Sequence, residues 1–262
     1  MSSKINKENL PRKFSSISSL NEVSKAEWDA CAGDENPFLC HDFLSSLEDS
    51  GSISPEAGWL SQHIICRNEE GLLIAAVPLY LKGHSYGEYI FDWSWADAWE
   101  RAGNKYFPKL LSGVPFTPVT CRKLLVKQGE DLISLQQALV QALVSVTKQL
   151  DVSSLHVNFI PPEEIKPFET TDFLNRSGLQ YHWLNKNYES FDDFLSELTS
   201  RKRKSIKKER KNALQNGIKI SALNGNDIKS FHWDAFYDFY LDTTDKKWGG
   251  AYLNKAFFEL IG

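Results

Sequence analysis

The chain has 262 residues, a formal net charge of −4, 42% hydrophobic residues and 24% charged residues. This composition is that of a soluble globular protein with one large domain or two ordinary ones. No apolar run approaches the roughly 20 residues of a membrane span, which excludes an integral membrane segment. The basic N-terminus has no apolar core behind it, which argues against a secretory signal. We expect residues 1–12 to form a disordered tail.

The four cysteines, Cys31, Cys40, Cys66 and Cys121, form neither CxxC pairs nor a dense disulfide pattern. Reduced thiols in a cytoplasmic protein are the simplest interpretation. Cys40 and His41 are adjacent, yet no second ligand pair has the spacing of a zinc site, so we expect no metal.

The first part of the chain carries alternating strand and helix signals. Ser24 with Glu27 three residues later predicts a capped helix, and Asp131 precedes leucines that recur every three or four residues, which predicts a long amphipathic helix. A turn ending in Gly71 joins two apolar runs as a hairpin. In chain order, we expect strands at 13–20, 61–66, 72–80, 88–95, 154–159 and 180–184, and helices at 24–31, 38–47, 132–150 and 171–176.

This order of elements resembles the plan of a GNAT-type acyltransferase domain. The resemblance implies an α/β protein with the GNAT-like (acyl-CoA N-acyltransferase) fold, a mixed sheet flanked by helices, at residues 13–188. In that fold two neighbouring parallel strands splay apart, and the acyl donor lies in the gap. Here we expect the gap between the strands at 88–95 and 154–159.

The rest of the chain repeats the opening of this plan. We expect one basic linker helix at 189–217, a strand at 218–223, and helices at 228–242 and 253–261. The tripeptide Trp-Asp-Ala occurs at 28–30 and again at 233–235. A single strand with two helices has no sheet of its own to pack on. We therefore expect a tandem arrangement in which residues 218–262 start a second, truncated GNAT-like domain, or one that a partner chain completes.

The stretch 86–120 combines aromatic and charged side chains. Its tryptophans and charges are Trp93, Trp95 and Trp99 beside Asp92, Asp97, Glu100 and Arg101. An apolar core rarely contains so many charges, because an unpaired buried charge is costly. A lined substrate cleft is the favoured interpretation, and a partly exposed strand end covered by tryptophans is the alternative.

Four motifs carry a resemblance to a family: FDWSWADAWERAG at 91–103, YFPKLLSGVPFTPVT at 106–120, SRKRKSIKKER at 200–210 and TDKKWGGAYL at 244–253. They resemble the predicted N-acyltransferases of the FemAB-like branch of the GNAT superfamily, the peptidoglycan biosynthesis/recognition family. The resemblance spans residues 38–262. It implies transfer of an acyl or aminoacyl group to an amine, on a small molecule or a cell-wall precursor.

The acyl donor stays open between acyl-CoA and aminoacyl-tRNA. Acetyl-CoA-using GNAT domains hold the pyrophosphate on a glycine-rich loop before the long helix. Here that loop has one glycine, Gly129, and the acids Glu130 and Asp131 where an anion should bind. Acetyl-CoA bound in the usual way to this half is therefore not expected. FemAB-type relatives use aminoacyl-tRNA, and a basic helical element there helps to hold the RNA.

A basic block with eight cations in eleven positions lies at 201–211. Bound phosphates would relieve the repulsion between these charges, so RNA or another polyanionic donor is one interpretation. A solvated helix surface and a membrane surface are the others. The candidate nucleic-acid or phosphate-binding residues are Arg201, Lys202, Arg203, Lys204, Lys207, Lys208 and Arg210.

Acyl transfer to an amine needs a base for the nucleophile and hydrogen-bond donors for the acyl oxygen. The candidate bases are Asp92 and Asp97, since desolvation among tryptophans can raise a carboxyl pKa. Tyr106 is the third candidate catalytic residue, as a donor. A salt bridge to Arg101 or a turn cap is the alternative role for each acid. The candidate substrate-binding residues are Trp93, Trp95, Trp99, Arg101, Lys109, Lys247 and Trp248.

The sequence thus predicts a cytoplasmic N-acyltransferase that acts on an amine and uses no metal. The alternative is a non-catalytic, degenerate GNAT module that binds RNA or a cell-wall precursor. A DNA-binding protein is a third reading with only the basic block in its favour.

Overall fold

A computed structural model describes residues 12–247 and 249–262. Trp248 and the predicted tail, except its last residue, lie outside the described residues. The chain divides into two units. The first contains the described residues up to Phe173 together with Lys229–Gly262, and the second is Leu174–Ile228. Among the described residues, no helix is both long enough and apolar enough to cross a membrane.

Eight strands in the first unit form two four-stranded sheets, ordered β1-β3-β4-β7 and β2-β5-β6-β8. Only Gln62 separates β2 from β3. Pro78 and Leu79 separate β4 from β5, and the second break follows from Pro78, because proline cannot donate a hydrogen bond to the strand ladder. All pairings are antiparallel except that of β6 with β8. The strands are β1 (Lys13–Ile17), β2 (Trp59–Ser61), β3 (His63–Arg67), β4 (Leu73–Val77), β5 (Tyr80–Lys82), β6 (Lys109–Ser112), β7 (Leu125–Val126) and β8 (Leu155–Val157).

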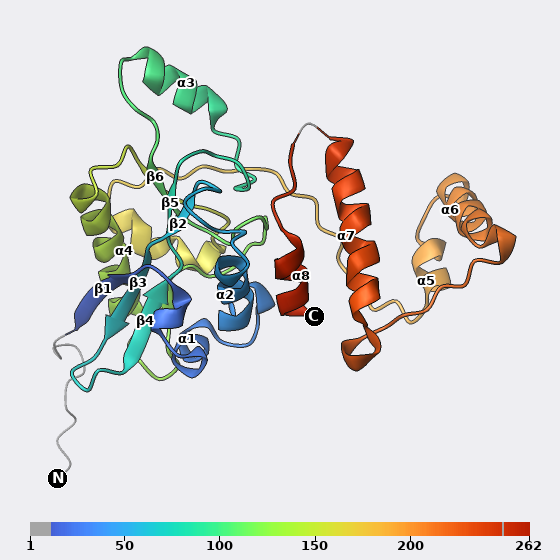
Figure 1. The fold of residues 1–262 in the computed structure, drawn as a ribbon, viewed down its shortest axis with the longest axis horizontal. Coiled ribbons are helices and arrows are strands. Elements are labelled where there is room, and N and C mark those ends of the chain that lie inside the picture. Colours follow the sequence, from blue (N-terminus) through green and yellow to red (C-terminus); the bar gives the residue numbers. More distant parts are fainter. Residues whose placement is uncertain (1–11, 248) are drawn as a thin grey trace, which may run out of the picture. The chain divides into compact units, whose positions relative to one another are not determined.

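Helices cover both faces of these sheets (Figure 1). Trp28, Leu44 and Leu47 pack into one core, whereas Leu139 and Leu143 pack into a second core with the alternate residues of β3 and β4. This alternation follows from the period of two along a strand. The helices of this unit are α1 (Lys25–Ala32), α2 (His41–Asp49), α3 (Trp93–Arg101), α4 (Leu132–Gln149), α7 (Ser230–Asp245) and α8 (Lys255–Ile261).

Helix α8 packs on α2, and α7 packs on α8. Phe257 and Phe258 of α8 are buried in the first core, where Phe43 of α2 lies 5.8 Å from the Phe257 ring. Helices α7 and α8 therefore form where they were predicted. The predicted strand at 218–223 does not form, and the tandem arrangement stays a prediction.

The sequence signals that involve only near neighbours along the chain are confirmed for α1, α4 and the hairpin of β3 and β4. The capping box of Ser24 and Glu27 opens α1, and Asp131 caps α4 by accepting a bond from Ser134 N. The hairpin of β3 and β4 forms around Gly71, which has φ 79°. These elements needed only neighbours within four residues, so sequence was enough to predict them.

The segment 88–112 was assigned wrongly. The predicted strand at 88–95 is instead a coil leading into α3, where Asp97 and Arg101 pair one turn apart. The strand that pairs with β8 is β6, for which no strand was predicted. The predicted helix at 171–176 and strand at 180–184 are also absent from the structure. Most of their apolar residues lie on the surface, as Leu174 and Tyr181 are almost fully exposed, whereas Phe173 packs against the second core.

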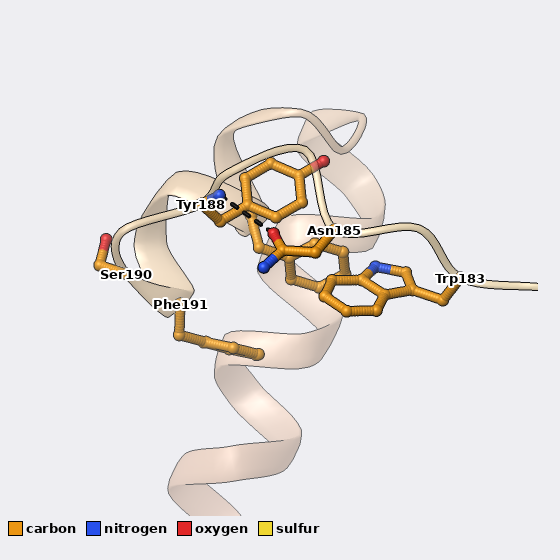
Figure 2. A pocket seen from close by; sticks show the side chains of 6 residues that line it. Trp183, Asn185, Tyr188, Ser190 and Phe191 are labelled. Atoms are coloured by element: carbon orange, nitrogen blue, oxygen red, sulfur yellow. Dashed lines mark hydrogen bonds between the residues drawn. The ribbon is translucent and has the colours of Figure 1, made fainter. Parts of the chain in front are cut away.

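The second unit contains two helices, α5 (Phe191–Ser196) and α6 (Ser200–Ala213), in place of the single predicted linker helix. Arg203 of α6 explains the break, because its guanidinium donates to the carbonyls of Leu195 and Leu198 and so caps the end of α5. The chain before α5 forms a hollow of about 410 Å³ with it. Figure 2 shows the Trp183 and Tyr188 rings on this hollow, with the Asn185 side chain turned back to accept the Tyr188 N–H.

Candidate functional site

Lys109, the first residue of β6, lies at the centre of a fully buried polar cluster. Its Nζ donates to Ser85 Oγ at 2.8 Å, to Glu88 Oε2 at 2.9 Å and to Asp92 Oδ2 at 2.5 Å. The sheet thus supplies the cation, and the coil between β5 and α3 supplies both carboxylates.

Asp92 extends this cluster towards β8. Its Oδ2 also accepts the Tyr106 hydroxyl at 2.7 Å, and that hydroxyl lies 3.4 Å from His156 Nε2. His156 Nε2 in turn lies 3.0 Å from Ser154 Oγ. Polar groups therefore run without interruption from residue 85 to the parallel strand pair.

Each carboxylate of the cluster keeps one oxygen without a partner. Neither Glu88 Oε1 nor Asp92 Oδ1 has a hydrogen-bond partner among the described residues, although both atoms are buried. A buried polar atom left unpaired costs about 1–3 kcal/mol. Two such acceptors in one cluster, with two acids against Lys109, suit a cationic donor such as an ammonium group.

The two carboxylates differ in proton affinity. Burial raises the pKa of Glu88, and the nearby Lys109 only partly opposes this. Burial also acts on Asp92, but the bonds from Lys109 and the hydroxyls outweigh it and hold the pKa of Asp92 below its usual range. Asp92 therefore stays ionised, which suits binding better than taking up a proton.

Three predicted residues meet in this cluster: Asp92, Tyr106 and Lys109. Glu88, Ser85 and His156 were missed as site residues. Lys109, which precedes two leucines in an apolar run, was the signal that could have led to them. A lysine is rarely buried without an acidic partner, so such a position predicts a nearby carboxylate.

The other predicted residues of the stretch lie on the surface of α3. Asp97 pairs with Arg101 at 2.9 Å, with both side chains largely exposed, so the salt bridge that the sequence left as its alternative is what forms. Trp93, Trp95 and Trp99 are each 44–49% exposed. Lys247 is exposed after α7, and Trp248 lies outside the described residues.

The gap expected between parallel strands is not found between β6 and β8, because these two strands are hydrogen-bonded to each other. Beyond Phe159, whose carbonyl accepts the N–H of Cys121, Glu164 brings a buried carboxylate to the residues just before β7. This carboxylate accepts Lys123 N at 2.7 Å and Leu124 N at 2.9 Å. A donor that pairs with the main chain at these residues would have to displace it.

The N-terminus of α4 is also occupied. Asp131 Oδ1 accepts Ser134 N at 3.2 Å, and Arg12 donates to Ser134 Oγ. The helix end that an anion would use already has a carboxylate. Nor do the described residues contain a group of three His, Cys, Asp or Glu side chains that could hold a metal ion.

The basic block has two faces on α6. Three of the predicted phosphate-binding residues are engaged with α5: Arg203 at its carbonyls, Lys207 in an ion pair with Asp192 at 2.9 Å, and Arg210 at 4.2 Å from the Phe191 ring. Spacings of three and four residues place the remaining cations mainly along one exposed stripe. The stripe consists of Arg201, Lys204, Lys208 and Lys211.

Comparison with known proteins gives a family and two solved structures. The chain is similar to an aminoglycoside antibiotic 6′-N-acetyltransferase from Acinetobacter baumannii, at 13% identity and TM-score 0.38 over 67% of this chain and 99% of that one. It is also similar to an acetyltransferase from Trypanosoma brucei, at 10% identity and TM-score 0.39 over 66% and 100%. No curated protein matches. The family model for FemAB-like proteins of peptidoglycan biosynthesis/recognition matches residues 19–262, and the chain therefore belongs to the FemAB-like family.

Proposed function

We propose that the chain is an N-acyltransferase that transfers an acyl or aminoacyl group to an amine, carried by a cell-wall precursor. Membership of the FemAB-like family supports the reaction class. The observation that carries the proposal is the pair of unpartnered, buried oxygens, Glu88 Oε1 and Asp92 Oδ1, beside Lys109.

The cluster has the chemistry to bind an acceptor ammonium. The N–H groups of the ammonium would complete the bonding of the two free carboxylate oxygens, and its charge would balance the second carboxylate. Lys109 and Tyr106 hold Asp92 in place, since both donate to the same oxygen. Asp92, first a candidate base, is assigned here to binding.

A GNAT-like fold of the first unit is part of this proposal. Its support is the order of elements in that unit and the parallel pair of β6 and β8 among its otherwise antiparallel strands. The tandem arrangement is supported only by α7 and α8, since the strand expected at 218–223 does not form. The carboxylates of Glu164, beside β7, and of Asp131, at the start of α4, disfavour the binding of acyl-CoA to these main-chain N–H groups. Aminoacyl-tRNA is the other donor, and the exposed stripe on α6 is the surface that favours it.

A non-catalytic binding module is the second candidate. The observation in its favour is that the same carboxylates fill the donor positions while the Lys109 cluster is closed to solvent. Such a module would bind an amine without turning it over.

The test is transfer of a labelled acyl group from acetyl-CoA or aminoacyl-tRNA to a panel of amines that includes a cell-wall stem peptide, followed by mass spectrometry. Glu88→Gln should raise the KM for the amine roughly 10-fold to 100-fold, because it removes a hydrogen bond to a charged group. The matched control is Glu100→Gln, on the exposed surface of α3. Equal KM values for the two variants would contradict the site. Amine binding without transfer by the unmodified chain would favour the binding module.

A further inference from the structure

Two buried lysines lie side by side on neighbouring strands. Lys82 of β5 and Lys109 of β6 are directly opposite in the antiparallel register, and both are completely buried. Side chains opposite each other in such a pair start about 5 Å apart, and like charges there repel. Two ammonium groups in this position therefore need either two sets of counterions or the loss of one proton.

The two lysines have very unequal partners. Lys109 has both carboxylates and Ser85, as described above. Lys82 Nζ has a single 3.3 Å bond to the carbonyl of Tyr86 and lies 3.3 Å from the centre of the Trp59 ring. Within the described part of the chain, no carboxylate oxygen comes within 4 Å of it. The counterions thus belong to Lys109.

An ammonium buried without a counterion is unstable relative to the neutral amine. Burial is accordingly the main cause that lowers the pKa of Lys82 to about 7, and the charge of Lys109 adds to it. Glu88 and Asp92 act in the opposite direction from a greater distance. His84 also faces this amine, and burial together with the Lys82 charge lowers the pKa of His84.

We propose that Lys82 is kept as an uncharged amine beside the charged Lys109 and accepts the proton that the acceptor ammonium must lose. This inference rests on the proposed function. The acceptor R–NH3⁺ gives one proton to the Lys82 nitrogen, and its lone pair forms the new C–N bond with the acyl carbon of an ester or thioester donor. The bond from that carbon to the leaving oxygen or sulfur breaks as the second N–H proton passes to the leaving group. Lys82 then returns its proton to solvent.

The position of Lys82 near the surface fits this role. Its hydrogen-bond partner, Tyr86, is 55% exposed, so the amine lies one residue beneath the solvent. The covering segment runs from Gly83 to Gly87, and Gly87 is required there because a Cβ would meet the Phe116 ring at 2.6 Å. The exposed lysines of α6 have no comparable surroundings.

The first measurement is a pH titration of the lysine side-chain signals by NMR, with ¹³C- and ¹⁵N-labelled lysine in the full chain. Burial also lowers the pKa of Lys123, so Lys123→Met is titrated as well. We expect a signal with a midpoint near 7 that is lost in Lys82→Met and kept in Lys123→Met and in the exposed control Lys148→Met. The inference is overturned if no lysine other than Lys123 titrates well below 10, or if the signal near 7 survives in Lys82→Met. This result does not depend on turnover, so it separates this inference from the proposed function.

The second measurement is the pH profile of acyl transfer to the same amines, with the donor that supports turnover. Lys82→Met should lower kcat at least roughly 100-fold and remove the acidic limb near pH 7, with the KM for the amine nearly unchanged, because loss of a proton acceptor acts on the chemical step. Lys82→Arg, which stays charged, should lose as much. If the variants keep the wild-type rate and profile, Lys82 is not the proton acceptor.

Discussion

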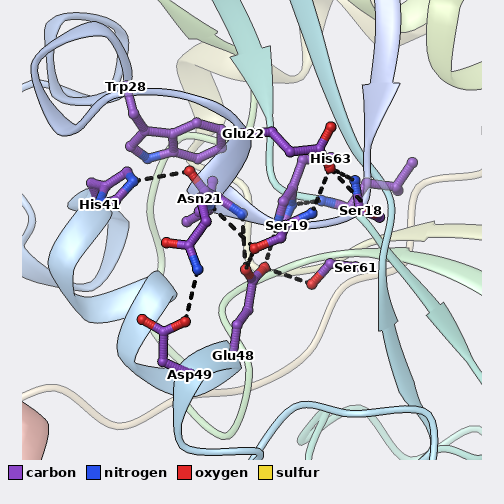
Figure 3. Close-up of polar contacts among 12 residues, drawn as sticks. Ser18, Ser19, Asn21, Glu22, Trp28, His41, Glu48, Asp49, Ser61 and His63 are labelled. Atoms are coloured by element: carbon purple, nitrogen blue, oxygen red, sulfur yellow. Dashed lines mark hydrogen bonds and ion pairs between the residues drawn. The ribbon is translucent and has the colours of Figure 1, made fainter.

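Two polar clusters in the first unit are both built around carboxylates, but they differ in whether every carboxylate oxygen has a hydrogen-bond donor. In the cluster around Glu48, the carboxylate accepts four bonds, from Ser19 Oγ, Leu20 N, Ser61 Oγ and His63 Nε2, at 2.6–2.9 Å (Figure 3). His63 Nδ1 accepts the N–H of Leu79, so Nε2 carries the proton that goes to Glu48. Neither oxygen of Glu48 is left without a donor.

The Lys109 cluster is incomplete by the same standard. Its two carboxylates share one ammonium and leave two oxygens unpaired. The Glu48 carboxylate joins the start of the chain, α2, β2 and β3, and needs nothing more. The difference indicates that the first cluster holds the fold together, whereas the second is arranged for a group that the chain itself does not provide.

The largest expected effect is that of Lys109→Met. Removing the ammonium leaves two buried carboxylates without a counterion, which should lower the free energy of unfolding by about 3–5 kcal/mol. Chemical denaturation of this variant against Lys105→Met, an exposed control, measures it. A loss of less than about 1 kcal/mol would mean that water reaches the two carboxylates, which would contradict the difference between the Lys109 and Glu48 clusters.

Glu48→Gln should have the next largest effect, about 2–3 kcal/mol, because an amide nitrogen cannot accept from the four donors. Bonds to the carboxylate outweigh its burial and lower the pKa of Glu48. This stabilisation is therefore present above the unfolded pKa and is lost as pH falls through the folded one. The denaturation midpoints of wild type and Glu48→Gln should therefore differ at pH 7 and become similar at pH 3. Glu56→Gln, which is exposed, should follow wild type at both.

Lys82 gives a pH dependence of the opposite kind. Its folded pKa of about 7 lies below the unfolded value of 10.5, so the unfolded chain binds the extra proton between these values. Stability should therefore rise with pH from about 7 to 9. Above that range the buried thiols of Cys31 and Cys66, with pKa values of about 12 and 11, act in the other direction. Thermal unfolding of Lys82→Met should show a smaller rise between pH 7 and 9, because the buried Lys123, whose pKa burial also lowers, still contributes. An unchanged slope would show that Lys82 keeps its proton.

Glu88→Gln should have the smallest effect on stability, within about 1 kcal/mol, although it raises the KM for the amine. Burial already disfavours the charge of Glu88, and the amide oxygen can still accept from Lys109. The measurement is denaturation at pH 7 beside Glu48→Gln. Equal losses for these two variants would remove the distinction between the clusters.

The sequence by itself determined the elements that depend on near neighbours. The capping box of α1, the leucine spacing of α4 and the glycine turn of the hairpin each lie within a few residues, and all form as predicted. Asp92, Tyr106 and Lys109 were recognised as candidates for a similar reason, because they are polar residues inside an aromatic stretch.

Only the tertiary structure decided which charges meet. Glu88 and Lys109 are 21 residues apart, and Glu48 and His63 are 15 apart, so no local period relates them. Lys82 and Lys109 become neighbours through the register of β5 with β6, and β6 was not predicted. The tryptophans of α3 would have faced the core if residues 88–95 were a strand, and they face solvent in the helix. The structure has the helix, because β6 takes the place beside β8 that this strand was predicted to take. Burial and register are properties of the whole chain, which is why the pairing of charges could not be read from local sequence.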